Sequence, residues 1–205
     1  MTARNTEVAL GLLSATLSHM EATSVFRAVM QSLDGDLIIA VVAAVLLTWL
    51  CHSSVAVVLL IASLAGAGMM SPVTAMALVL GANVGGALPS VLSAGSTVAR
   101  RLPVGNLLIR LLGTVLLLPW LPLLANQLAQ TNLGPAHLVV YLHTVFNLAL
   151  AVLCIGLIEP MANGLSRLFP QQERPADPGS VFVSICYLVI SLVIGFAAVE
   201  LFGSG

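Results

Sequence analysis

The feature that most constrains the fold of this chain is an uncharged run of 34 residues, positions 37–70, interrupted only by the polar group His52-Ser53-Ser54. A helix that crosses a membrane needs about 20 apolar residues, because each one contributes about 1.5 Å to a hydrocarbon layer of about 30 Å. The run is therefore too long for one span and too short for two. It fits a re-entrant hairpin of two short helices with the polar group at its tip. The two helices would cover residues 37–50 and 55–67.

Composition places the rest of the chain in a membrane as well. The 205 residues are 59% hydrophobic and 7% charged, and the mean hydropathy is +1.08. A soluble domain of this size could not leave so little polar surface for water. The net charge of −1 and the absence of lysine argue against nucleic acid as a partner. Cys51, Cys154 and Cys186 lack metal-ligand or redox spacing, so we expect small buried apolar side chains there.

The remaining segments are expected to form spans and short connections. Three spans would follow the hairpin, and the first of these contains three glycines and Pro89, which predict an interrupted or closely packed helix. Glu159-Pro160 would end the third span, ahead of a short amphipathic helix. A cleaved signal peptide at the N-terminus is the weaker alternative to short helices there. The predicted segments are 1–36 (short helices and a turn), 72–94, 103–124 and 137–158 (spans), 171–180 (linker) and 181–203 (a last transmembrane helix).

Arginine placement predicts the orientation. Two arginines lie in the loop 95–103 and two in the segment 159–180, and two spans separate these loops. Both loops therefore lie on one side, and the positive-inside rule makes that side cytoplasmic. We expect a multi-pass protein of the inner (plasma) membrane whose hairpin enters from the outer side.

Five segments of the chain carry a resemblance to a known family. They are LTWLCHSSVA (47–56), LGANVG (80–85), ARR (99–101), GNLLIR (105–110) and HTVFN (143–147). In this order they resemble the repeated signature of type II sodium-dependent phosphate cotransporters and their bacterial relatives. That signature has Gln-Ser-Ser in the hairpin, followed by Gly-Ala-Asn-(Ile/Val)-Gly. The resemblance covers about residues 21–170.

Two departures from the family pattern affect the interpretation. His52 stands where the commonest pattern has glutamine, although His-Ser-Ser also resembles a bacterial variant. The family is built from two inverted repeats, whereas this sequence contains one signature and resembles the C-terminal repeat alone. The resemblance therefore implies an all-α, polytopic membrane protein that is one half of an inverted-repeat transporter. A second repeat, supplied by another chain, is the expected partner.

The resemblance implies secondary active transport of inorganic phosphate, coupled to sodium by alternating access. No covalent step is needed, so we expect no enzymatic activity, and no cofactor other than sodium as the coupling ion. Serine hydroxyls, backbone N–H groups and the positive helix end would meet at the hairpin tip, which suits a compact anion. Alternatively, the serines bond to carbonyls one turn earlier in a continuous buried helix. The expected substrate-binding residues are His52, Ser53, Ser54 and Asn83, and the sodium ligands are Ser54 and Asn83.

Seven further residues are candidates for lining the site: Thr48, Gly81, Gly85, Asn106, Arg110, His143 and Asn147. Arg110 lies inside an apolar span, so it either extends to the cytoplasmic interface or pairs within the bundle. His143 and Asn147 are four residues apart and share one helix face. They either join helices or line the site.

Two rival functions fit the same residues. The first is a partner subunit, or a remnant of a transporter, that keeps the fold without transporting. The second is an intramembrane hydrolase in which Ser53 or Ser54 is activated by His52 or His143. Adjacent His and Ser on one helix point in different directions and no Gly-x-Ser-x-Gly motif is present, so the second is disfavoured. Inorganic phosphate, sodium and the lipid bilayer are the expected partners.

Overall fold

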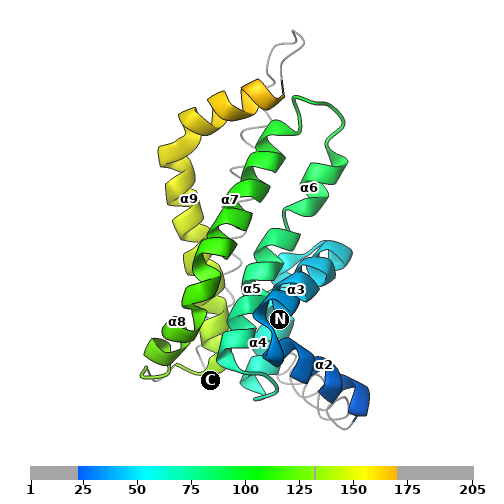
Figure 1. Ribbon diagram of the computed structural model, residues 1–205, viewed down its shortest axis with the longest axis vertical. Coiled ribbons are helices and arrows are strands. Elements are labelled where there is room, and N and C mark those ends of the chain that lie inside the picture. Colours follow the sequence, from blue (N-terminus) through cyan, green and yellow to red (C-terminus); the bar gives the residue numbers. More distant parts are fainter. Residues whose placement is uncertain (1–22, 132, 170–205) are drawn as a thin grey trace, which may run out of the picture.

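The computed structural model describes residues 23–131 and 133–169, in which every regular element is a helix (Figure 1). The predicted C-terminal span 181–203, the linker, Cys186 and residues 1–22 lie outside the described residues. The helices are α2 (Ser24–Gly35), α3 (Leu37–Cys51), α4 (Ser54–Gly66), α5 (Pro72–Gly85), α6 (Leu88–Ser93), α7 (Arg101–Leu117), η1 (Leu118–Trp120), α8 (Leu121–Leu128) and α9 (Pro135–Leu168).

The uncharged run folds as two short helices, α3 and α4, with the break at His52-Ser53. Asp36 caps α3, because its carboxylate accepts from the N–H groups of Ile38 and Ile39 at 2.7 and 3.3 Å. His52 ends α3 in the left-handed conformation, with φ 54°. Ser53 then starts α4, since its hydroxyl accepts from the backbone N–H of Ala56 at 3.2 Å. The sequence therefore encodes both the stop and the new start.

The two ends of this hairpin lie together. The carboxylate of Asp34, before α3, accepts from the backbone N–H of Ser71, after α4, at 3.1 Å. Figure 1 shows the tip near the middle of the molecule's longest axis, close to the junction of α5 and α6. Helices arranged in this way can enter and leave a membrane on one side.

Within the described residues, three helical segments are long and apolar enough to cross a membrane: Pro72–Ser93, Arg101–Leu128 and Pro135–Leu157. Their ends lie within a few residues of the three spans expected from the sequence. The first is interrupted between α5 and α6, around Gly86 and Ala87, as its glycines and proline predict. The described chain is thus an all-helical membrane protein.

The end of α9 differs from the sequence-based expectation. We expected Glu159-Pro160 to stop the helix, but α9 continues through Pro160 to Leu168. Figure 1 shows that its last turns bend across the top of the molecule. Proline lacks the N–H for one helical bond and its ring crowds the preceding turn, so it can kink a helix without ending it.

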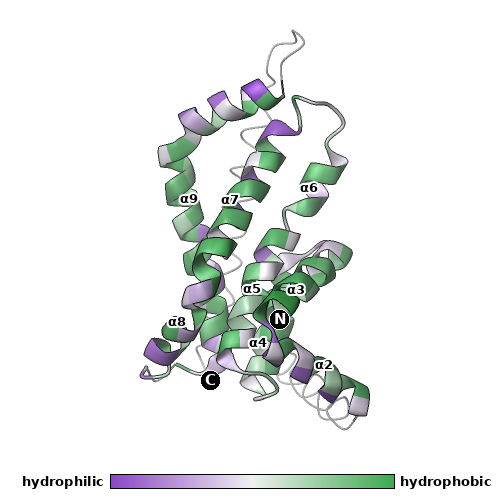
Figure 2. Ribbon diagram, in the orientation of Figure 1, coloured by the Kyte–Doolittle hydropathy of each residue, from purple (hydrophilic) through white to green (hydrophobic). Residues whose placement is uncertain are grey.

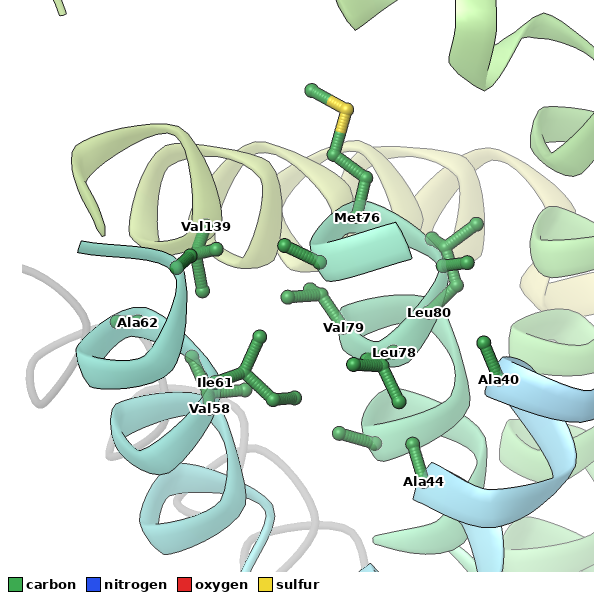
Figure 3. Close-up of a cluster of buried hydrophobic side chains, with 14 of the residues drawn as sticks. Ala40, Ala44, Val58, Ile61, Ala62, Met76, Leu78, Val79, Leu80 and Val139 are labelled. Atoms are coloured by element: carbon green, nitrogen blue, oxygen red, sulfur yellow. The ribbon is translucent and has the colours of Figure 1, made fainter. Parts of the chain in front are cut away.

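Helix α5 is the centre of the packing, with α3, α4 and α9 around it (Figure 3). All its residues from Thr74 to Gly85 are buried. On one side, small residues at four-residue spacing let α3 approach closely: Ala44 and Thr48 of α3 pack against Gly81 and Gly85 of α5. We call this contact the glycine seam. On the other side, Val58, Ile61 and Ala62 of α4 and Val139 of α9 complete the apolar core.

The outward faces are apolar, as lipid contact requires. Figure 2 shows mostly hydrophobic ribbon on α7 and over α3, with hydrophilic positions at helix ends and at a few places inside the bundle. Large exposed side chains on α7 include Leu108, Leu111, Leu112, Val115 and Leu116. Exposed leucine at this density is typical of a lipid-facing helix.

Candidate functional site

The polar centre of the bundle is Asn83 on α5, which is fully buried. Its amide nitrogen donates to the carbonyl of Val79 at 3.0 Å. Its side-chain oxygen accepts two hydrogen bonds, from Arg110 Nη1 of α7 at 3.2 Å and from Asn147 Nδ2 of α9 at 2.8 Å. One oxygen thereby joins three helices.

Arg110 turns inward towards this centre. Besides its bond to the Asn83 side chain, it donates to the Asn83 carbonyl at 3.3 Å and, through Nε, to Asn106 Oδ1 at 3.0 Å. Asn106 and Arg110 are one turn apart on α7, so the asparagine orients the guanidinium along its own helix. Of the two alternatives that the sequence left open, the structure has the pairing within the bundle.

His143 and Asn147 reach the same centre from α9 and are only 4% and 5% exposed. Asn147 also donates to the carbonyl of His143 at 2.8 Å. Both ring nitrogens of His143 are buried and have no hydrogen-bond partner among the described residues. Thr114, four residues after Arg110 on α7, is buried with an equally unpartnered hydroxyl. We did not single out Thr114 from the sequence, although its spacing from Arg110 was the available signal.

The hairpin tip lies one helical turn from this centre. A Cβ added at Gly86 would lie 3.1 Å from Ser54 Cβ and 3.3 Å from Ser54 Oγ, so Ser54 rests against the backbone just after Asn83. Ser53 uses its hydroxyl to cap α4. The exposed ring of His52 has Nδ1 3.2 Å from the carbonyl of Leu50.

Gly81, Gly85 and Thr48 lie between α3 and α5. A Cβ on Gly85 would meet the carbonyl oxygen of Val45 at 2.5 Å and Thr48 Cβ at 2.8 Å, both closer than real contacts. Thr48 is fully buried with no partner for its hydroxyl. In this conformation the three residues set the distance between the hairpin and α5.

Apart from Thr48, Gly81 and Gly85, the candidate residues thus form two neighbouring groups connected by α5, one turn apart. The polar network contains Asn83, Asn106, Arg110, His143 and Asn147, and the hairpin tip contains His52, Ser53 and Ser54.

The chemistry available here is binding by neutral oxygens, amides and one guanidinium. No group of three or more His, Cys, Asp or Glu residues that could hold a metal ion occurs in the described part of the chain. The two sodium candidates, Ser54 and Asn83, offer a hydroxyl and an amide oxygen, which suit a hard cation. His143 has no hydrogen bond to either hairpin serine, so this conformation contains no assembled His143–Ser pair.

Comparison with known proteins assigns the family. The sequence matches the family model described as Na+/Pi-cotransporter over residues 8–195, which is most of the chain. The chain belongs to the Na+/Pi-cotransporter family. The resemblance inferred from the five short segments is confirmed. No solved structure matches significantly.

Several curated relatives of this Na+/Pi-cotransporter family chain are longer proteins. It is 34% identical over 157 residues to YjbB of Escherichia coli (strain K12), which is provisionally named as an inorganic phosphate export protein. YjbB of Salmonella typhimurium is 32% identical over 182 residues, and uncharacterised YqeW of Bacillus subtilis is 28% identical over 131. These matches cover 76%, 86% and 63% of the chain but 29%, 34% and 41% of the relatives. The chain thus spans about a third of the length of YjbB.

Proposed function

We propose that this chain contributes one half of a transporter that moves inorganic phosphate across the membrane together with sodium. The observation that carries the proposal is the position of Ser54, which lies against Gly86 and one turn from the buried Asn83. A polar hairpin tip is thereby brought next to a polar network inside an otherwise apolar bundle. Family membership and the phosphate-export name of YjbB support phosphate as the substrate.

The hairpin tip has the groups that a phosphate ion needs. The first N–H groups of α4 lack helical partners, and the positive end of that helix favours an anion. Ser53 and Ser54 add hydroxyls, and His52 adds a ring that is exposed at the tip. In this proposal phosphate binds at the start of α4, while the oxygens of Ser54 and Asn83 contribute to a sodium site.

A contact between the start of α7 and the end of α9 supports the proposed orientation. The guanidinium of Arg101, at the start of α7, donates to the carbonyl of Phe169, at the end of α9. The two arginine-bearing segments therefore lie side by side, at the top of Figure 1. We assign this end to the cytoplasm by the positive-inside rule and place the chain in the inner membrane.

The second half of the transporter is proposed to come from another chain. An inverted-repeat transporter places its site between two halves of opposite orientation. An upside-down copy of this chain would need a weak orientation bias, yet the arginines of both segments favour one side. A separate chain carrying the first repeat avoids that conflict. A non-transporting subunit remains the alternative, and transport measurements distinguish the two.

The test is uptake of [32P]phosphate into right-side-out and inside-out vesicles, with sodium or choline as the cation. We expect sodium-dependent transport that Ser54→Ala reduces at least about tenfold. Ser63→Ala, in the same helix but away from the tip, is the matched control and should behave as wild type. Transport that is absent both in cells expressing this chain alone and in its native host would contradict the proposal and favour a non-transporting role.

A further inference from the structure

Arg110 carries a positive charge whose partners in the structure are neutral. It lies on the membrane-spanning segment Arg101–Leu128, and its hydrogen bonds end on oxygens of Asn83 and Asn106. Such a charge inside a membrane is costly unless an opposite charge or a functional ligand accompanies it.

None of the described carboxylates has a hydrogen bond or ion pair with Arg110, whose hydrogen-bond partners are Asn83 and Asn106. Asp34 bonds to Ser71 at the open end of the hairpin, and Asp36 caps α3 at the same end. Glu159 lies on α9 two residues before Met161, which packs against Gly105 near the start of α7, and it forms no ion pair with Arg110. Within residues 23–131 and 133–169, no acidic side chain therefore pairs with the guanidinium.

The donors around Asn83 already have the arrangement that an oxyanion requires. A guanidinium N–H and an amide N–H, from α7 and α9, converge on the single oxygen Asn83 Oδ1 at 3.2 and 2.8 Å. Charge-assisted bonds from arginine to a phosphate oxygen are stronger than bonds to a neutral amide oxygen. A phosphate oxygen could therefore replace Asn83 Oδ1 between the same two donors.

Unpartnered polar groups one turn away extend this arrangement. His143 precedes Asn147 by four residues and Thr114 follows Arg110 by four, so each shares a helix face with one of the two donors. Both are more than nine-tenths buried, and their side-chain polar atoms have no partner among the described residues. Buried polar atoms without partners are uncommon, which indicates a ligand or water that completes them.

We propose that Arg110 binds the transported oxyanion directly, inside the bundle, with Asn147, Thr114 and His143 as the other contacts. This inference rests on the proposed phosphate transport and adds to it a second binding position, beyond the hairpin tip. In the substrate-free state, the guanidinium of Arg110 donates its hydrogen bonds to Asn83. When phosphate arrives, Arg110 exchanges the neutral oxygen of Asn83 for an anionic one.

The test is [32P]phosphate binding to the full chain, purified in lipid nanodiscs together with its partner chain if one copurifies. Arg110→Gln should weaken binding at least about tenfold, the equivalent of one charge-assisted hydrogen bond. Thr114→Val, which keeps the side-chain shape, should weaken it several-fold. Arg100→Gln is the matched control, because Arg100 is exposed and donates to the carbonyl of Ala94. The phosphate affinity of this variant should equal that of the wild type.

A measurement on the wild-type protein covers the case in which Arg110→Gln does not fold. Phenylglyoxal modifies arginines, and mass spectrometry gives the rate at each one. Phosphate should slow modification of Arg110 relative to Arg100 and Arg101. An unchanged relative rate at Arg110, or wild-type affinity in Arg110→Gln, overturns this inference and leaves phosphate transport standing. Wild-type protein that neither binds nor transports phosphate refutes the proposed function and this inference with it.

Discussion

The glycine seam between α3 and α5 supports a quantitative prediction for Gly85→Ala. The new Cβ would lie 2.5 Å from the carbonyl oxygen of Val45 and 2.8 Å from Thr48 Cβ, whereas ordinary contact begins at 3.4 Å. Moving the Val45 contact from 2.5 to 3.4 Å requires a shift of about 0.9 Å. A carbonyl oxygen belongs to the backbone, so no side-chain rotation relieves the clash and α3 itself must move.

Two opposing effects determine the size of the loss. Overpacking a well-filled contact costs about 1–3 kcal/mol, and a clash with backbone belongs at the upper end of that range. Alanine recovers up to about 1 kcal/mol because it is a better helix former than glycine. We therefore expect Gly85→Ala to lower the free energy of unfolding by about 2 kcal/mol.

Two other glycines provide matched controls. At Gly164, on α9, a Cβ would meet nothing within 4 Å, so Gly164→Ala should be neutral or stabilising by up to about 1 kcal/mol. At Gly105 the new Cβ would meet only the flexible ends of Leu165 and Met161, at 2.9 and 3.1 Å, so the loss should stay below about 1 kcal/mol.

Denaturation by SDS in mixed micelles measures these differences, with Trp49 on α3 as a fluorescent reporter. Phosphate transport should decline in Gly85→Ala as well, because the displaced hairpin carries Ser54 away from Gly86. If Gly85→Ala is as stable as wild type, or as stable as Gly164→Ala, α3 and α5 do not pack as described.

Three further predictions use the hairpin and the polar network. In a cysteine-free background, Asp36→Cys and Ser71→Cys should react with an impermeant maleimide from the same side of the membrane, and labelling from opposite sides would exclude a hairpin. His52→Gly should raise stability by up to about 1 kcal/mol, because a left-handed φ of 54° strains a residue with a Cβ, yet lower transport by removing the ring. A loss of stability would show that the ring supports the turn. Asn147→Leu should cost about 0.5–1.5 kcal/mol in SDS denaturation, since the Asn83 oxygen loses one of its two buried donors and keeps the other, Arg110; unchanged stability would mean that water replaces the donor.

Local interactions made the break between α3 and α4 predictable from the sequence. The uncharged run has a length that fits neither one span nor two, and His52-Ser53 supplies a helix stop followed by a cap. The glycines of α5 likewise indicated close packing or an interruption, and both occur. These features depend on residues that are near one another in the chain, so spacing and residue type were sufficient.

The polar network depends on contacts between segments that are distant in the chain, so the sequence predicted only part of it. From the sequence, Arg110 could extend to the membrane interface or pair inside the bundle. In the structure it pairs with Asn83, which lies 27 residues earlier in the chain. In the sequence Thr114 resembles an ordinary span residue, and its burial depends on how α7 packs in the bundle. Pro160 was expected to end α9, but a kink was sufficient. In each case the conformation depends on which helix packs alongside the residue. The neighbouring residues in the chain do not determine that packing.

The packing also indicates which helix can move when substrate binds. In an 18-residue apolar stretch of each span, 67% of the residues are buried in Pro72–Ser93 and 44% in Pro135–Leu157, against 11% in Arg101–Leu128. Of the three described spans, the one that contains α7 is therefore the least enclosed by protein, and its polar attachment to α5 is the pair of bonds from Arg110 to Asn83. If phosphate takes over the guanidinium, α7 loses that attachment while the glycine seam still fixes α3 to α5. We accordingly expect a short cross-link joining α7 to α9, between Cys residues at Gly113 and Phe146, to abolish transport while phosphate binding persists. Full transport by the cross-linked protein would show that α7 stays fixed and that the moving part lies elsewhere.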